Sequence, residues 1–295
     1  MRHRAYPDND YSWIEELYAT WHGEYSITVS VVLTTFNMKS LVEKTFCGLI
    51  LQTYPHELFE VIVSDDGSSD GIEELTSKYE RFFSRFSIII QEDKGYRLAT
   101  ARNNGVLESR NEVIISLDGD VLPVPELLEA HLRWFHLTEN LATVGYLRYV
   151  DTNSISPAEV LTKFESVRVL PDYGSISNWG NMSDRRLPEF VDFKHHPAAY
   201  NCFHGGNVGF RRRQAMDIGL FSEDFNGNWG YEDLEFGYRL WKSGVFLIPV
   251  PFALGLHQER VFLTTEERRR QRNINFEKMS RKVPGFKEYR EQIGR

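Results

Sequence analysis

The chain has 295 residues, of which 41% are hydrophobic and 26% are charged, a balance typical of a soluble globular protein. Its 34 Lys and Arg against 42 Asp and Glu give a formal charge of −8, which argues against a dedicated nucleic-acid-binding protein. Two cysteines are too few for a disulfide framework, and no apolar run approaches the roughly 18–20 residues of a membrane-spanning helix. The first ten residues lack the apolar stretch of a secretory signal, so we expect a cytoplasmic protein.

The glycine spacing excludes the two common nucleotide-binding loops. None of the 21 glycines is separated from another by a single residue, so the Gly-x-Gly turn of dinucleotide-binding folds is absent. No Gly-Lys dipeptide occurs either, which excludes a Walker A loop. If the chain binds a nucleotide, another arrangement must hold it.

The first half of the chain predicts alternating strands and helices. Residues 1–26 contain an amphipathic lead-in helix, marked by Trp13, Ile14 and Leu17. Apolar, β-branched runs then predict strands, and apolar residues at helical spacing predict helices between them. The predicted strands are 27–35, 59–64, 86–90 and 112–117, and the predicted helices are 41–50, 72–83 and 98–107. This alternation, with strands about 27 residues apart, predicts an α/β fold with a mostly parallel central sheet flanked by helices.

The second half is less regular. Residues 151–200 are rich in Pro, Ser, Asn, Gly and His and predict an irregular, functional loop region. Order returns at 203–210, in a predicted helix at 232–241 and in an apolar run at 245–256. The tail, residues 261–295, carries ten Lys or Arg against five Glu, a charge of +5 that leaves −13 on the remainder. We expect this basic tail to be helical, either packed on the domain or attracted as a peripheral contact to an anionic membrane surface.

Polar side chains follow several predicted strands at their carboxyl ends, where parallel sheets bind ligands. Asn37 follows the first strand, Asp65 and Asp66 the second, and Asp118-Gly119-Asp120 the fourth. Two carboxylates flanking a glycine suit a hard cation such as Mg²⁺ or Mn²⁺ that also binds substrate phosphates. An ordinary turn before the next element is the alternative for each acidic pair.

Three further clusters are candidates for chemistry. Trp229-Gly230-Tyr231-Glu232-Asp233 joins an aromatic platform, suited to a sugar face, to carboxylates suited to sugar hydroxyls. His257 follows a strand-like run, and an imidazole added to two carboxylates favours Mn²⁺ over Mg²⁺. The cations from Lys94 to Arg102 stand near the end of the third strand, where they either neutralise a diphosphate or begin a surface helix.

Two motifs suggest other activities. Residues 67–71 read Gly-Ser-Ser-Asp-Gly, the spacing of a hydrolase nucleophile elbow, although only one predicted strand precedes them. His195, His196, His204 and Cys202 offer zinc-binding atoms, although their spacing matches no usual zinc pattern. Because glycosidases also use a pair of carboxylates, glycoside hydrolysis is a further possible activity.

Taken in chain order, these segments resemble the family 2 glycosyltransferases of the GT-A fold. Five motifs carry the resemblance, which covers residues 27 to 259: Thr34 to Asn37, Ser64 to Ser68, Gly95 to Asn103, Asp118 to Asp120, and Trp229 to Asp233. Gly205-Gly206-Asn207 and the Trp-Gly-x-Glu-Asp segment are most similar to the galactosyltransferase-type C-terminal half, found also in chondroitin polymerases and polypeptide N-acetylgalactosaminyltransferases.

The resemblance implies a role for each matching position. Within a catalytic domain at 27–260, residues 27–120 are the implied nucleotide-binding half and residues 121–260 the acceptor-binding half. Asp66 is implied to bind uracil and Asp118 the ribose, with Thr35, Asn37 and Arg97 lining the nucleotide pocket. Asp120 and His257 are implied to hold Mn²⁺ or Mg²⁺ on the diphosphate. Asp233 matches the general base of inverting members, Glu232 a sugar contact, and Trp229, Gly230, Gly206 and Asn207 the donor or acceptor sugar site.

The implied activity is metal-dependent transfer of a sugar from a UDP-sugar donor to a hydroxyl of a saccharide or glycoconjugate acceptor. A base opposite the departing UDP predicts inversion of the anomeric carbon. Two alternatives remain: a retaining enzyme similar to the N-acetylgalactosaminyltransferases, and a non-catalytic nucleotide- or carbohydrate-binding module.

Overall fold

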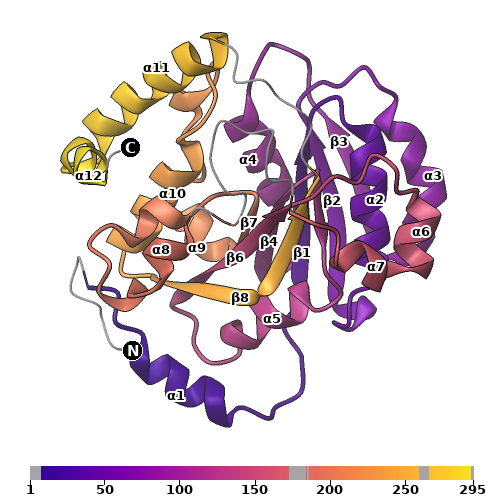
Figure 1. The fold of residues 1–295 in the computed structure, drawn as a ribbon, viewed down its shortest axis with the longest axis horizontal. Helices are drawn as coiled ribbons and strands as arrows, with labels where there is room; N and C mark the ends of the chain where they lie inside the picture. The colour runs from indigo at the N-terminus through magenta and orange to yellow at the C-terminus, as the bar shows by residue number, and fades with distance from the viewer. Residues whose placement is uncertain (1–7, 173–183, 185, 259–265, 294–295) are drawn as a thin grey trace.

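The computed structural model describes residues 8–172, 184, 186–258 and 266–293. Helices surround one eight-stranded sheet in the order β3-β2-β1-β4-β7-β6-β8-β5 (Figure 1). The strands are β1 (Val29–Thr35), β2 (Phe59–Asp65), β3 (Phe86–Ile90), β4 (Val113–Asp118), β5 (Val121–Pro123), β6 (Leu141–Tyr149), β7 (Asn207–Arg211) and β8 (Phe246–His257). This is the predicted α/β class.

The first half of the sheet, β3-β2-β1-β4, is entirely parallel, as the alternating pattern predicts. Every residue of β1 and β2 is buried, which explains why the sequences of these strands are mostly apolar rather than strictly alternating. The connecting helices are α2 (Lys39–Ile50), α3 (Leu75–Tyr79) and α4 (Leu98–Glu108). The predicted helix 72–83 is shorter than expected, because 3₁₀ turns stand on both sides of α3.

The second half of the sheet breaks the parallel order at β7, which runs antiparallel to both β4 and β6. β8 pairs in parallel with β6, and the short β5 pairs antiparallel with the end of β8. β7 and β8 occupy the predicted ordered segments, whereas β6 was not predicted. The β5–β8 pairing sets Val121 beside His257, which brings the residues after β4 next to the end of β8.

The irregular region predicted at 151–200 contains short helices in its described part. They are α6 (Pro157–Thr162), α7 (Phe164–Arg168) and α8 (Leu187–Phe190), followed by two 3₁₀ turns. Residues 173–183 and 185 of this region lie outside the described residues. The remaining helices are α1 (Ser12–Thr20), α5 (Leu127–Phe135), α9 (Arg212–Asp217) and α10 (Glu232–Lys242).

The C-terminal tail forms α11 (Glu266–Lys282) and α12 (Phe286–Gln292), which lie beside α10 at one end of the molecule (Figure 1). Met279, Val283 and Phe286 are buried, so one side of the tail packs on the domain. Within the described ranges, no helix combines the length and apolarity that a bilayer crossing requires.

Candidate active site

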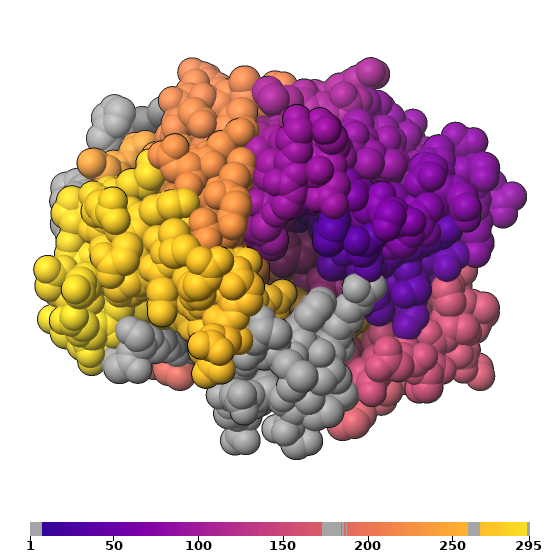
Figure 2. All heavy atoms as spheres, turned by 90° about the horizontal axis from the view of Figure 1, so that it is seen from above, coloured from indigo at the N-terminus to yellow at the C-terminus, as the bar shows by residue number. Residues whose placement is uncertain are grey.

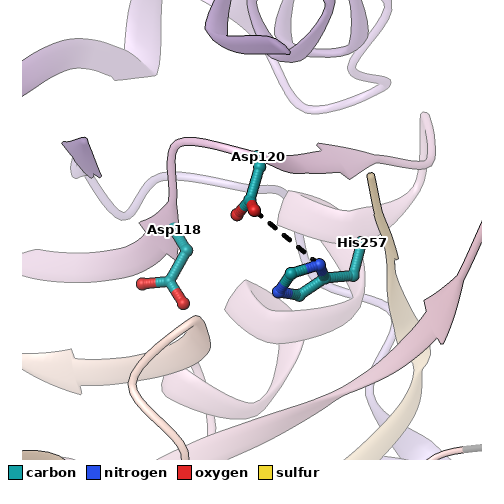
Figure 3. A group of neighbouring side chains, drawn as sticks. All are labelled: Asp118, Asp120 and His257. Atoms are coloured by element: carbon teal, nitrogen blue, oxygen red, sulfur yellow. Dashed lines mark ion pairs between the residues drawn. The ribbon is translucent and has the colours of Figure 1, made fainter. Parts of the chain in front are cut away.

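Three side chains converge at the carboxyl ends of β4 and β8. Asp118 ends β4, Asp120 follows one glycine later, and His257 ends β8. One ligand atom from each lies within 4.8 Å of the other two, around a common point (Figure 3). The Nδ1 atom of His257 is 3.8 Å from an Asp120 carboxylate oxygen. The structure therefore brings the two predicted metal ligands, Asp120 and His257, close together and places Asp118 beside them.

This cluster has the chemistry of a divalent-cation site. Nδ1 of His257 is buried and has no hydrogen-bond partner among the described residues, although it faces Asp120. The imidazole stacks on Tyr149, with ring centroids 4.8 Å apart, which fixes its orientation. Two carboxylates and one imidazole suit Mn²⁺ better than Mg²⁺, which prefers oxygen alone.

The turn between the two aspartates is held from both sides. The Gly119 amide donates to the Thr34 carbonyl at 2.8 Å, and the Thr45 hydroxyl of α2 donates to the Gly119 carbonyl at 2.9 Å. A Cβ atom at Gly119 would lie 2.9 Å from the Cβ of Thr35, so the backbone passes too close for a side chain. The ordinary turn considered as the alternative is thus present. The same turn also positions Asp118 and Asp120 of the cluster.

A buried arginine links this cluster to the start of α10. Arg102 of α4 is 2% exposed and donates to Asp118 at 2.9 Å and to Glu232 at 3.2 Å. The sequence interpretation counted Arg102 among cations near the diphosphate or a helix start. Instead its guanidinium is engaged by two carboxylates, and the neighbouring Asn103 binds the backbone of Phe221.

Glu232 and Asp233 open α10 with different surroundings. Glu232 is 3% exposed, and burial together with the adjacent Asp233 raises its pKa despite the opposing charge of Arg102. Asp233 is half-buried and accepts the Gly205 amide at 3.0 Å and the Leu234 amide at 2.8 Å. A carboxylate in the first turn of a helix is also favoured by the helix dipole.

The Gly205-Gly206 pair lets the backbone approach these charges. A Cβ atom would lie 1.9 Å from Nη1 of Arg102 at Gly205 and 2.5 Å from a carboxylate oxygen of Asp118 at Gly206. The Gly206 carbonyl also accepts the Asp118 amide at 3.1 Å. Through this pair the metal cluster and Asp233 share one continuous network.

The predicted nucleotide-binding residues stand at the ends of β1 and β2. Asp66 is buried and accepts the Arg97 amide at 2.8 Å and the side-chain amide of Gln91, and burial raises its pKa. The buried hydroxyl of Thr35 has no partner among the described residues. Asn37 is held by Ser69, whose amide donates to it at 2.9 Å.

Two of the residues predicted for the sugar site, Asn207 and Trp229, contact other parts of the chain. Asn207 is fully buried, donates to the Tyr146 and Ala253 carbonyls at 3.0 and 2.9 Å, and lies 3.0 Å from a ring nitrogen of His131. It therefore has no free surface for a sugar. Trp229 is half-buried and carries the guanidinium of Arg268 5.3 Å from its ring centroid.

The alternative motifs have structural roles. Ser69, at the centre of the hydrolase-like spacing, contacts Asn37, and Asp70 accepts the Lys39 amide at 2.8 Å, so this turn caps α2 rather than the following helix. His195 is exposed against Asp192, whereas His196 contacts Tyr289 on α12, so the two do not converge on one metal. The Cys202 thiol contacts Glu189.

A space-filling view shows a hollow between the N-terminal part of the chain, in indigo and purple, and the C-terminal part, in orange and yellow (Figure 2). A parallel half-sheet with a candidate metal-binding cluster of carboxylates at its strand ends is typical of the GT-A class of glycosyltransferases. The fold belongs to that class.

Comparison with known proteins identifies the family. The model described as glycosyl transferase family 2 matches residues 30–214, and the model described as the N-terminal domain of galactosyltransferase matches residues 185–259. The chain belongs to glycosyl transferase family 2.

Curated relatives are longer than this chain. A chondroitin synthase of Escherichia coli is 29% identical over 90% of this chain and 40% of its own length. A hyaluronan synthase of Pasteurella multocida is 31% identical over 88% of this chain and 27% of its own length. A validoxylamine A glucosyltransferase of Streptomyces hygroscopicus subsp. limoneus is 36% identical over 74% of this chain and 48% of its own length. The chain thus spans about half or less of each.

Solved structures share the fold at low identity. GalNAc-T7 with UDP, GalNAc and Mn²⁺ has a TM-score of 0.59 at 20% identity, covering 81% of this chain and 45% of that one. The mannosyltransferase PcManGT from Pyrobaculum calidifontis with GDP-Man and Mn²⁺ has a TM-score of 0.57 at 18% identity, covering 92% of this chain and 71% of that one.

Proposed function

We propose that this chain transfers a sugar from a UDP-sugar to a hydroxyl of a saccharide or glycoconjugate acceptor, with a divalent cation and with inversion of the anomeric carbon. The observation that carries the proposal is the convergence of Asp118, Asp120 and His257 beside the Arg102-linked pair Glu232 and Asp233. Residues 27–120 would bind the nucleotide, and residues 121–260 would bind the acceptor.

The cation site would be formed by Asp120 and His257, with Asp118 either joining them or binding the ribose. Mn²⁺ bound there would stabilise the negative charge that grows on the diphosphate as the sugar leaves, without any proton transfer. The chain's own contribution is orientation: Arg102 fixes Asp118, and Tyr149 fixes the ring of His257.

We propose uracil as the base of the donor nucleotide because of the hydrogen bonds that Asp66 already accepts. Gln91 and the Arg97 amide already donate one hydrogen bond to each carboxylate oxygen, so the single imide N–H of uracil is the better match than the paired donors of guanine. The Thr35 hydroxyl, which has no partner among the described residues, would be a further nucleotide contact. Structural relatives bind UDP in some cases and GDP in another, so the fold alone does not decide the base.

Asp233 is the proposed general base. An acceptor hydroxyl is a weak nucleophile until its proton leaves, and a positioned carboxylate assists that step by about 10²–10⁴ in rate. The Gly205 amide donates to one oxygen of Asp233 and the Leu234 amide to the other, and the side chain is half-buried. A single base acting opposite the departing UDP gives inversion, whereas a retaining enzyme requires attack from the same face.

Calorimetry and product analysis test the proposal together. UDP is titrated into the wild-type protein with and without Mn²⁺, beside GDP, and into D120A and H257A, with the exposed Asp217→Ala as control. We expect Mn²⁺-dependent UDP binding that D120A and H257A abolish and that D217A keeps. The anomeric configuration of the product, read by NMR, decides inversion. Equal UDP affinity with and without Mn²⁺ contradicts the metal site, and binding without any transfer supports the binding-module alternative.

A further inference from the structure

The loop before α10 has a strained backbone. Gly227, Gly230 and Tyr231 have φ angles of 83°, 89° and 75°. The left-handed region is open to glycine but unfavourable for a residue such as Tyr231. Tyr231 directly precedes Glu232 and Asp233, so the direction of these carboxylates depends on that conformation. Strain of this kind persists only where surrounding contacts impose it.

A single side chain of the tail binds this loop. Asn275 of α11 is fully buried, and its Nδ2 atom lies within hydrogen-bond distance of three loop carbonyls. The acceptors are Phe225 at 3.1 Å, Asn228 at 2.9 Å and Gly230 at 2.9 Å. These contacts join both ends of the loop to one amide, with Gly230 adjacent to the strained Tyr231.

Other tail residues contact the same segment. The ring of Tyr231 packs edge-on against Phe276 of α11 and Phe286 of α12, at centroid distances of 6.0 and 5.8 Å. Lys278 donates to the Asp224 carbonyl at 2.6 Å, one residue before Phe225. The tail helices lie beside α10 at one end of the molecule (Figure 1), and the yellow surface of the tail meets the orange part of the chain (Figure 2).

We propose that Asn275 is a positioning residue for the transfer reaction, holding the 226–231 loop so that Asp233 faces the acceptor hydroxyl. The inference rests on the proposed function of Asp233. It gives the basic tail a role inside the enzyme, distinct from any contact with a membrane. Removing Asn275 frees the loop from its imposed conformation while leaving Asp118, Asp120 and His257 untouched.

The first test compares N275A with M279A. Met279 is buried one turn later on α11, so M279A weakens the packing of the same helix without removing a donor to the loop. We expect N275A to lower kcat by about 10- to 100-fold, since a misplacement of about 1 Å costs up to roughly 100-fold. The KM for the donor and the Mn²⁺-dependent affinity for UDP stay within about twofold, because the loss occurs in the transition state. We expect M279A to keep the wild-type kcat, even where its Tm falls as far as that of N275A.

The second test restores the donor. Asn275→Asp keeps the shape but places acceptors against three carbonyls, and protonation of this buried carboxyl returns one donor. We therefore expect the kcat of N275D relative to N275A to rise as the pH falls. A pH-independent ratio contradicts the hydrogen-bonding role.

Amide exchange gives a readout that does not need activity. In N275A, the amides of residues 226–233 should exchange faster than in M279A, while those of β1 and β4 stay unchanged. Wild-type kcat in N275A, or equal losses in the two variants, overturns the proposal. If the wild-type protein transfers no sugar, the proposed function fails, and the exchange rates still decide whether Asn275 holds the loop.

Discussion

Arg102→Met tests the network that joins the two halves of the site. The guanidinium is almost fully buried between Asp118 and Glu232, so its removal leaves one buried and one partly exposed carboxylate without their shared cation. Methionine keeps much of the side-chain volume, which limits the packing loss. The effect should therefore report the charge rather than a cavity.

The size of the effect follows from the burial of the two partners. Breaking a buried ion pair by removing one member costs about 3–5 kcal/mol. Since the side chain of Asp118 is 34% exposed and therefore partly screened by water, the lower figure applies. A loss of about 3 kcal/mol corresponds to a fall of roughly 6–12 °C in Tm.

The loss should depend on pH with a definite sign. In the wild-type fold Glu232 has a pKa raised from 4.5 to about 8, so the folded state keeps a proton that the unfolded chain releases. The contribution of this group to the free energy of unfolding therefore falls as the pH rises between these values. Without Arg102 the pKa of Glu232 rises further, because the cation that favoured its charged form is gone. The deficit of R102M relative to wild type should therefore stay level between pH 5 and about pH 7 and grow as the pH rises through about 8, where only the wild-type Glu232 loses its proton.

Thermal and urea unfolding of wild type, R102M, E232Q and the double variant across this pH range supply the measurement. Glutamine at position 232 removes the group whose pKa shift produces this loss, so the double variant should lose less stability than the sum of the two single losses. Additive losses, or a deficit of R102M that shrinks as the pH rises, would refute the proposed pairing.

Three more perturbations follow from the site. D233N should lower transfer by about 10²–10⁴ with UDP affinity nearly unchanged; loss of UDP binding in calorimetry contradicts its role as base. G206A should weaken Mn²⁺-dependent UDP binding, because its Cβ would lie 2.5 Å from an Asp118 carboxylate oxygen; wild-type affinity speaks against that close approach. Arg269→Glu with Arg281→Glu reverses exposed tail charges away from Asn275, so liposome flotation should fall if the tail touches anionic membranes, and equal flotation removes that idea.

The sequence predicts the first half of the fold well, because its parallel strands are mostly apolar and rich in β-branched residues. β1, β2, β3 and β4 fall within two residues of their predicted ranges. The proximity of Asp118 and Asp120 is also accessible from sequence, since Asp118 ends a strand, Asp120 comes two residues later, and ligands gather at strand ends. His257 joins them through the β5–β8 pairing, which the sequence does not show.

The remaining features depend on contacts that have no local signal. β6 was missed because Gly145 interrupts its apolar run, at a place where a Cβ atom would lie 2.3 Å from the side-chain amide of Asn207. Arg102 resembles any cation on a helix, and only the fold shows it buried against Glu232, 130 positions later. Asn275 stands in a highly charged helix, and its target loop lies about fifty residues earlier.

The most direct test of the central claim is anomalous diffraction from crystals grown with UDP and Mn²⁺. We expect a manganese peak coordinated by Asp120 and His257, with the diphosphate as a further ligand and Asp118 in contact with the cation or the ribose. A diphosphate bound elsewhere, or a manganese peak away from all three side chains, would contradict the account.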